Sequence, residues 1–330
     1  MKETAEPPSE PLAPEAIFSR ETAVECPHFM AVAGYIGTKY CLPKYVWRRG
    51  GLLYHYTDAA GLLGIVSTNR LWATDVDFLN DPSEGTLFPK RLLENMRQKP
   101  GGLSALETEI IDLIEAELAK HTTDSRTFSV SFCGEGDLLS QWRGYGSFGS
   151  GYAIGFDPEH IVHPQLGRLI EVQYGVEGLE DIALDLLSIY VEASPKWGNM
   201  LCDETTRVLL FLSLGFKDST YSEERETRIL TQASDQATDW KRDVAPLRFR
   251  TRGSDIVPYI SLPAKPFISD GNQNVETLKA GEHPSPLPIR RIVTGPGVDY
   301  SRAKTSLERL LKVQGYEDVD VIPSAVPFRC

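Results

Sequence analysis

The sequence predicts an α+β fold, because segments with the two-residue alternation of strands lie between segments whose apolar residues recur at helical spacing. The clearest strand signal is the segment 126–132, in which apolar residues alternate with serines. The clearest helix signal is the segment 104–120, where Ser104 can cap the first turn and Glu107 follows three residues later.

Length and composition predict a globular protein with one domain. The chain has 330 residues and is 41% hydrophobic, enough to form a sizeable core. Residues 1–24 are rich in proline and glutamate and are expected to form a disordered tail, so we expect a single domain over residues 25–330. No apolar run has the length of a membrane helix, and the N-terminus lacks the pattern of a signal peptide, so a cytoplasmic location is expected.

Cysteine usage and net charge exclude several classes of protein. The five cysteines are scattered singly and have no histidine at metal-ligand spacing, so we expect neither a disulfide framework nor a bound metal. The net charge of -12 repels nucleic acid as a whole. The basic residues between 241 and 252 are a local exception, although such a run is more often a solvated edge.

The segment 52–57 is a predicted strand that places His55 and Thr57 on one face. A short helix is expected behind Asp58, and it closes near residues 69–72. Asn80, Asp81 and Pro82 then predict a turn before a helix that ends near residue 96. The turn either caps that helix or lies at the mouth of a site that includes His55.

The rest of the chain continues the mixed pattern. Short helices are expected over 138–146 and 301–313, and a long helical region over 179–214. The residues 269–288 predict a long loop. The remaining predicted strands cover residues 151–156, 169–174, 257–262, 289–294 and 319–322.

A strand beginning near Glu224 would place Glu224, Glu226 and Arg228 on one face. Two carboxylates at this spacing raise the pKa of one of them unless a cation lies between them, and Lys217 or Arg228 can be that cation. The alternative is an exposed edge strand with salt bridges.

A glycine pattern at residues 144–149 spells G-x-G-x-x-G. The dinucleotide-binding fingerprint requires a strand before the glycines and a helix after them, whereas here the predicted order is helix, glycines, strand. We therefore reject a Rossmann loop at this position.

Several short motifs together resemble the bacterial family of unknown function DUF2971, over residues 52–329. The motifs that carry the resemblance are Tyr54-His55-Tyr56-Thr57, Leu71-Trp72, Leu79-Asn80-Asp81-Pro82, Ser131-Phe132, Trp142 with Tyr145-Gly146, Gly151 to Phe156, Lys217, Glu224-x-Glu226-x-Arg228, Gly295-Pro296 and Ser324 to Arg329.

That family in turn resembles the ADP-ribosyltransferases, in which an early strand carries His-x-Thr and a later strand carries the catalytic glutamate. The resemblance implies a split β-sheet core with helical insertions, and NAD as co-substrate. It implies that Glu226, with Glu224 and His55, is catalytic. The middle position is open between Ser131, Tyr145 and Tyr152, and the implied NAD-binding residues are His55, Thr57, Tyr56, Ser131, Trp142, Arg143 and Tyr145.

The expected function is therefore ADP-ribosylation of a protein or nucleic acid, as a bacterial toxin or phage-defence effector that an antitoxin or partner protein can silence. An NAD glycohydrolase on the same site and a non-catalytic binding or sensor module are the alternatives. A nuclease with a metal held by Asp75, Asp77, Asp81 and Glu84 is a weaker one, because these residues fit turn chemistry better.

Overall fold

The computed structural model describes residues 19–27, 29–40, 51–81, 85–121, 126–161, 168–175, 178–198, 206, 209–210, 212–233, 247–252, 254–263 and 286–327. The chain packs into two compact units. The first consists of Met1–Leu42, Gly85–His121 and Val176–Leu214, and the second of Pro43–Glu84, Thr122–Gly175 and Gly215–Cys330. The single domain over residues 25–330 stays a prediction, because packing alone does not show which parts fold independently.

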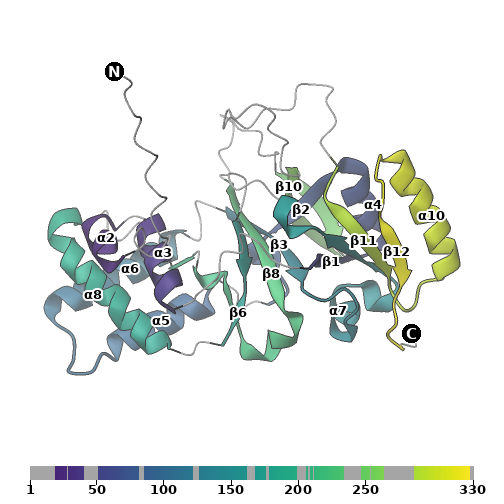
Figure 1. Cartoon of the computed structure of the whole chain (residues 1–330). Helices are drawn as coiled ribbons and strands as arrows, with labels where there is room; N and C mark the ends of the chain where they lie inside the picture. Colours follow the sequence, from purple (N-terminus) through teal and green to yellow (C-terminus); the bar gives the residue numbers. More distant parts are fainter. Residues whose placement is uncertain are drawn as a thin grey trace, which may run out of the picture. The chain divides into compact units, whose positions relative to one another are not determined.

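The described part of the first unit is helical (Figure 1). The sequence-predicted cap of the helix at 104–120 is present, since the Ser104 hydroxyl accepts from the Glu107 amide at 3.2 Å and the Glu107 carboxylate accepts from the Ser104 amide at 2.8 Å. Helices of this unit are α2 (Arg20–Glu25), α3 (Phe29–Tyr40), α5 (Leu87–Arg97), α6 (Ala105–His121) and α8 (Leu179–Trp197).

Two expectations for the chain ends and loops need comment. Of the predicted tail, residues 1–18 lie outside the described residues, whereas residues 20–24 belong to α2, in which Ala23 is fully buried. Most of the loop predicted at 269–288 also lies outside the described residues.

The second unit is built on a large, mostly antiparallel sheet in the order β12-β11-β4-β1-β3-β2-β10-β9. Strand β8 pairs with β3 along its whole length, and β5 pairs with β8. The strands are β1 (Leu53–Thr57), β2 (Arg70–Asp75), β3 (Arg126–Cys133), β4 (Tyr152–Phe156), β5 (Arg168–Glu171), β8 (Glu226–Ala233), β9 (Arg248–Arg252), β10 (Asp255–Pro263), β11 (Ile289–Thr294) and β12 (Asp320–Pro323). A separate parallel pair joins β6 (Gln173–Tyr174) to β7 (Phe216–Lys217).

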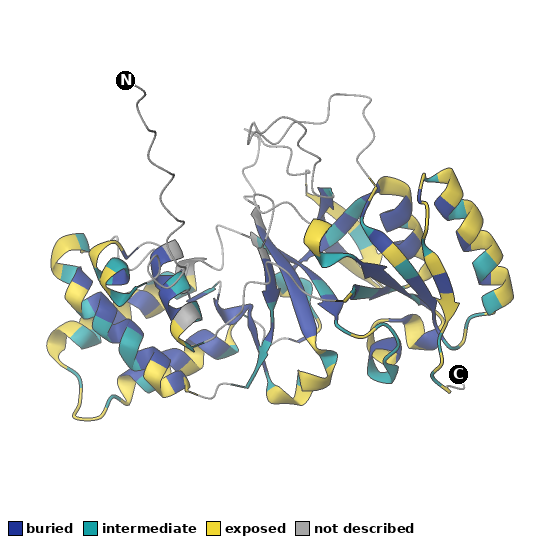
Figure 2. Ribbon diagram, viewed as in Figure 1, coloured by how far each residue is buried: buried dark blue, intermediate teal, exposed yellow. Residues whose placement is uncertain are grey.

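Helices cover both faces of this sheet (Figure 1). On one face α4 (Ala59–Thr68) and α10 (Tyr300–Val313) pack on the main apolar core. Figure 2 shows α10 buried along one side and exposed along the other. On the opposite face α7 (Leu139–Gly144) places Trp142 against Tyr56. Short 3-10 helices are η1 (Val76–Phe78), η2 (Ser147–Gly149), η3 (Pro158–His160) and η4 (Ser219–Glu224).

The sheet forks at β3. Strands β1 and β2 are both antiparallel to β3, so they run parallel to each other, and α4 connects them. Tyr54 of β1 pairs with Cys133, whereas Thr74 of β2 pairs with Ser129 farther along the same edge, because β8 occupies the other edge. The two strands therefore separate between Ser129 and Cys133.

Strand β2 was not predicted from the sequence. Residues 69–72 were expected to close the preceding helix and residues 73–84 to form a turn region. The structure instead ends α4 at Asn69, whose φ of 52° is left-handed, and starts a strand at once. Leu71 and Ala73 are fully buried, so their core packing decides the strand.

Candidate functional site

The register of β3 and β8 places Glu226 on one face of the sheet together with Arg228, Ser131 and Cys133. Cys133 pairs with Glu226, and Ser131 pairs with Arg228. Paired residues of antiparallel strands point to the same side, so these four side chains share a face. It is the face that carries Tyr56 and Trp142.

Glu226 lies in a buried ion cluster. Its Oε1 accepts from Arg228 Nε at 2.6 Å, and its Oε2 accepts from Arg228 Nη2 at 2.8 Å and from Lys217 Nζ at 3.1 Å. All three residues are at most 5% exposed. Burial on its own raises the pKa of Glu226, but the charges of Arg228 and Lys217, with hydrogen bonds from Arg228 and Ser131, hold it at about 2. Both cations proposed from the sequence are therefore present.

Glu224 shares Lys217 with Glu226. Its Oε2 accepts from Lys217 Nζ at 2.7 Å, and its Oε1 accepts from the Tyr145 hydroxyl at 2.9 Å. Asn80 Nδ2 in turn donates to the Tyr145 hydroxyl at 2.8 Å. The Glu224 side chain is 12% exposed, against 6% for Glu226, and Tyr145 and Asn80 are exposed. Glu224 is thus the carboxylate of this pair that lies nearer the surface.

The two glutamates meet through a turn rather than through strand alternation. The expected strand from Glu224 is not formed, since Glu224 ends η4 and Arg225 takes a left-handed conformation with φ of 44°. Strand β8 begins only at Glu226. The turn brings both carboxylates to one ammonium group.

His55 lies on the opposite face of β1 from Tyr56. It pairs with Ile154, a residue of the main core, and its ring makes an edge contact with Phe132 at 6.0 Å between centroids. Its Nδ1 lies 2.9 Å from the backbone oxygen of Ser131, which can only accept, so Nδ1 carries the proton and Nε2 is the acceptor. Burial lowers the pKa of His55, and the charge of Arg250 lowers it further.

Ser131 connects His55 to Glu226. Its backbone oxygen accepts from His55 Nδ1, and it pairs with Arg228, whose guanidinium donates to Glu226. His55 makes no direct hydrogen bond to Glu224 or Glu226 in the described part of the chain. Ser131 therefore joins the two strands that carry them.

The other predicted NAD-binding residues divide between core and surface. Tyr56 is 7% exposed, and its hydroxyl donates to the Glu135 oxygen and accepts from the Leu138 amide. Trp142 is fully buried and donates to Asp137 at 2.7 Å. Both residues thus belong to the core in this structure, with no surface for a ligand at Trp142.

Thr57 and Arg143 lie away from this core. The Thr57 hydroxyl packs so closely on α4 that a Cβ added to Gly61 would lie 2.0 Å from it, so Gly61 is required there. Arg143 is exposed on α7.

Two residues that the sequence analysis did not propose, Tyr174 and Tyr221, also contact the ion cluster around Glu226 and Lys217. The Tyr174 hydroxyl accepts from the Glu226 amide at 2.7 Å, and Lys217 Nζ lies 5.0 Å from the centroid of the Tyr221 ring. Tyr174 and Lys217 come together because β6 and β7 pair. No sequence motif marks this two-stranded pairing.

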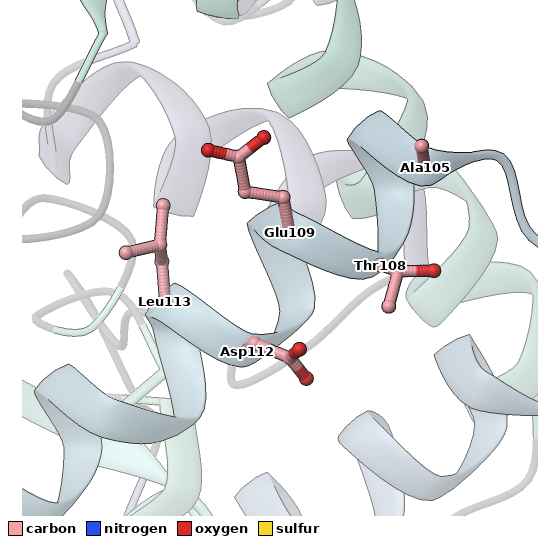
Figure 3. Close-up of a pocket in the computed structure, with 5 residues that line it drawn as sticks. All are labelled: Ala105, Thr108, Glu109, Asp112 and Leu113. Atoms are coloured by element: carbon pink, nitrogen blue, oxygen red, sulfur yellow. The ribbon is translucent and has the colours of Figure 1, made fainter.

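Other sites were sought in the described residues. Within those ranges no group of three or more His, Cys, Asp or Glu side chains can hold a metal ion, and no helix is long and apolar enough to cross a membrane. A surface hollow is lined by Ala105, Thr108, Glu109, Asp112 and Leu113 (Figure 3). All five residues lie on α6, so this hollow is a helix face with no converging polar groups.

Comparison with known proteins gives one match. No curated protein and no solved structure matches the chain. The family match covers part of the region over which the sequence motifs suggested a resemblance, and it includes Lys217, Glu224, Glu226 and Tyr145 but not His55. Residues 141–229 match the model of DUF2971, a family described as a protein of unknown function.

Proposed function

We propose that the chain is an ADP-ribosyltransferase that consumes NAD and modifies a protein or nucleic acid. The observation that carries the proposal is the connection through Ser131, which bonds the histidine at the fork of β1 and β2 and pairs with Arg228 of β8, whose guanidinium bonds Glu226. A forked sheet, with a histidine and a carboxylate on the strands beside the fork, fits the architecture that the sequence resemblance implies.

The chemistry requires a negative charge near the ribose. The bond between ribose C1′ and the nicotinamide nitrogen breaks, its electron pair leaves with neutral nicotinamide, and positive charge develops on the ribose. The acceptor then attacks C1′ and releases a proton to solvent or a base. A fixed carboxylate beside C1′ stabilises the developing charge.

Glu224 suits this role better than Glu226. Both Glu226 oxygens accept from cations, so the charge of Glu226 is already compensated. Among the described residues, Oε1 of Glu224 accepts only from the neutral Tyr145 hydroxyl. Burial and the charge of Glu224 raise the pKa of Tyr145, which keeps the phenol protonated as a donor. We therefore propose Glu224 as the catalytic residue and Glu226 as a positioning residue that holds Lys217.

His55 is proposed to bind a ribose hydroxyl of NAD by accepting its hydrogen bond. A neutral imidazole with its proton on Nδ1 presents Nε2 as an acceptor. Thr57, on the same face of β1, is proposed to hold the nicotinamide end. A role as a toxin or phage-defence effector stays a prediction.

The test is nicotinamide release from NAD by the purified full chain, with and without a cell lysate as a source of acceptors. We expect release together with a mass gain of one ADP-ribose on a lysate macromolecule. Release without any acceptor labelling would identify a glycohydrolase instead. No release, together with no rise in melting temperature on adding NAD, would contradict both activities and favour a binding module.

A further inference from the structure

Arg250 occupies an unusual position beside the fork. Its guanidinium carbon lies 5.5 Å from the centroid of the Trp72 ring and 5.8 Å from that of Tyr259, and its Nη2 donates to the Thr74 hydroxyl at 2.7 Å. The two rings lie 5.2 Å apart. The aromatic side chains of β2 and β10 thus hold the guanidinium of β9 in a fixed orientation.

The charge of Arg250 is not neutralised by an ion pair with any described carboxylate. Its Nε is buried and has no hydrogen-bond partner within the described ranges. Burial lowers the pKa of Arg250 and the neighbouring charge of Arg252 lowers it further, whereas the charges of Tyr259 and Asp58 raise it by less. A partly buried cation that no described carboxylate contacts directly is costly, and Asp58 acts on it only at longer range, so an anion at this position would be stabilised.

A second unsatisfied donor lies on the same face. Ser129 is 2% exposed, and its hydroxyl has no hydrogen-bond partner among the described residues. Ser129 pairs with Thr74, so both hydroxyls point to the same side of the sheet, and Thr74 already bonds Arg250. The Thr74 hydroxyl accepts from Arg250, which leaves its own proton available to a ligand.

The buried ion cluster of Lys217, Glu224, Glu226 and Arg228 has no cation left to bind a phosphate. Its cations, Lys217 and Arg228, are bonded to Glu224 and Glu226. In a chain of net charge -12, a phosphate needs a local positive charge that is not already paired. Arg250 has that property among the described residues, since its guanidinium donates to the neutral Thr74 hydroxyl and to no described carboxylate.

We propose that Arg250, Thr74 and Ser129 form a phosphate-binding site beside the fork, and that it takes the pyrophosphate of the dinucleotide substrate. The planar guanidinium matches phosphate oxygens with two parallel N–H donors, and the hydroxyls add further donors. The choice of dinucleotide rests on the proposed function. The site itself rests only on the unpaired donors.

The test is binding of ADP-ribose to the full chain by calorimetry, because ADP-ribose has a pyrophosphate but no nicotinamide bond to cleave. Arg250→Met should weaken binding by about 10- to 100-fold, the effect of one charge-assisted hydrogen bond or more. Arg248→Met removes an exposed arginine from the same strand and should change the affinity by no more than about threefold. Equal affinities of wild type and Arg250→Met would overturn the site.

Ser129→Ala separates ligand binding from a structural role. Removing a buried hydroxyl that has no partner should leave the melting temperature unchanged or raise it, while ADP-ribose binding weakens. A lower melting temperature with unchanged affinity would contradict the proposal.

A further binding experiment distinguishes a dinucleotide from a nucleic-acid backbone as the source of the phosphate. Binding of a short single-stranded oligonucleotide that depends on Arg250, without binding of ADP-ribose, would overturn the dinucleotide assignment in favour of a nucleic-acid backbone. ADP-ribose binding that depends on Arg250, in a chain that releases no nicotinamide, would support this site and contradict the proposed catalysis. The two proposals can therefore fail separately.

Discussion

His55 and Glu226 lie on different strands and are joined through Ser131, whose backbone oxygen accepts from the imidazole and which pairs with Arg228, the residue whose guanidinium bonds the Glu226 carboxylate. The connection crosses from β1 to β8 through β3, which pairs with both strands. A substitution of Glu226 is therefore expected to affect the contacts of β3 and His55 as well as the ion pairs of Glu226.

Glu226→Gln should lower the free energy of unfolding by about 3–5 kcal/mol, because it leaves Arg228 and Lys217 buried without the carboxylate that both contact. Urea denaturation followed by tryptophan fluorescence measures the change. Glu135→Gln is the control, since the Glu135–Arg225 pair is more than half exposed and should contribute about 1 kcal/mol or less. Equal losses in both variants would show that the buried cluster adds no stability.

The stability that Glu226 provides should depend on acid pH. Its pKa in the folded chain is about 2, below the ordinary value of 4.5, so the unfolded chain binds the proton more readily. The contribution is complete above about pH 4.5 and is lost as the pH falls toward 2. Denaturation series at pH 6, 4 and 3 should show the wild type approaching Glu226→Gln. A difference in the free energy of unfolding that stays constant between pH 6 and pH 3 would contradict the low pKa of Glu226.

His55 is expected to be neutral at pH 7, with its proton on Nδ1, because burial lowers its pKa below 6.5 and the Ser131 oxygen accepts from Nδ1. Long-range proton–nitrogen NMR spectra distinguish the two tautomers, and His55→Gln assigns the signal. A proton on Nε2, or a midpoint above pH 6.5, would exclude the proposed acceptor role.

The regular elements could be predicted from the sequence, since local patterns decide them. The alternation at 126–132 gives β3, and the Ser104 cap starts α6. Strand β2 was missed because its pairing with β10 and β3 is set by distant residues. Local propensity does not contain that information.

The candidate site was predictable only in part. The spacing of Glu224 and Glu226 suggested a pair that shares a cation, and Lys217 is that cation. The sequence did not indicate that a left-handed Arg225 forms the turn between them, or that Tyr174 joins them. The turn at Asn80 was left open between capping a helix and lying at the mouth of the site, and Asn80 donates to Tyr145. Trp142 suggested a ligand contact, but its complete burial follows from packing on Tyr56, which only the fold reveals.

The central claim is tested most directly by nicotinamide release from Glu224→Gln, with Glu223→Gln as the matched control. Both residues lie in η4, and Glu223 is exposed. Glu224→Gln should lose at least about 100-fold in rate, the effect expected when a transition-state carboxylate is neutralised. Its melting temperature should fall by less than that of Glu226→Gln, because Lys217 keeps Glu226 as its partner. Glu223→Gln should keep the wild-type rate. Wild-type turnover in Glu224→Gln would contradict the assignment of Glu224 as the catalytic carboxylate.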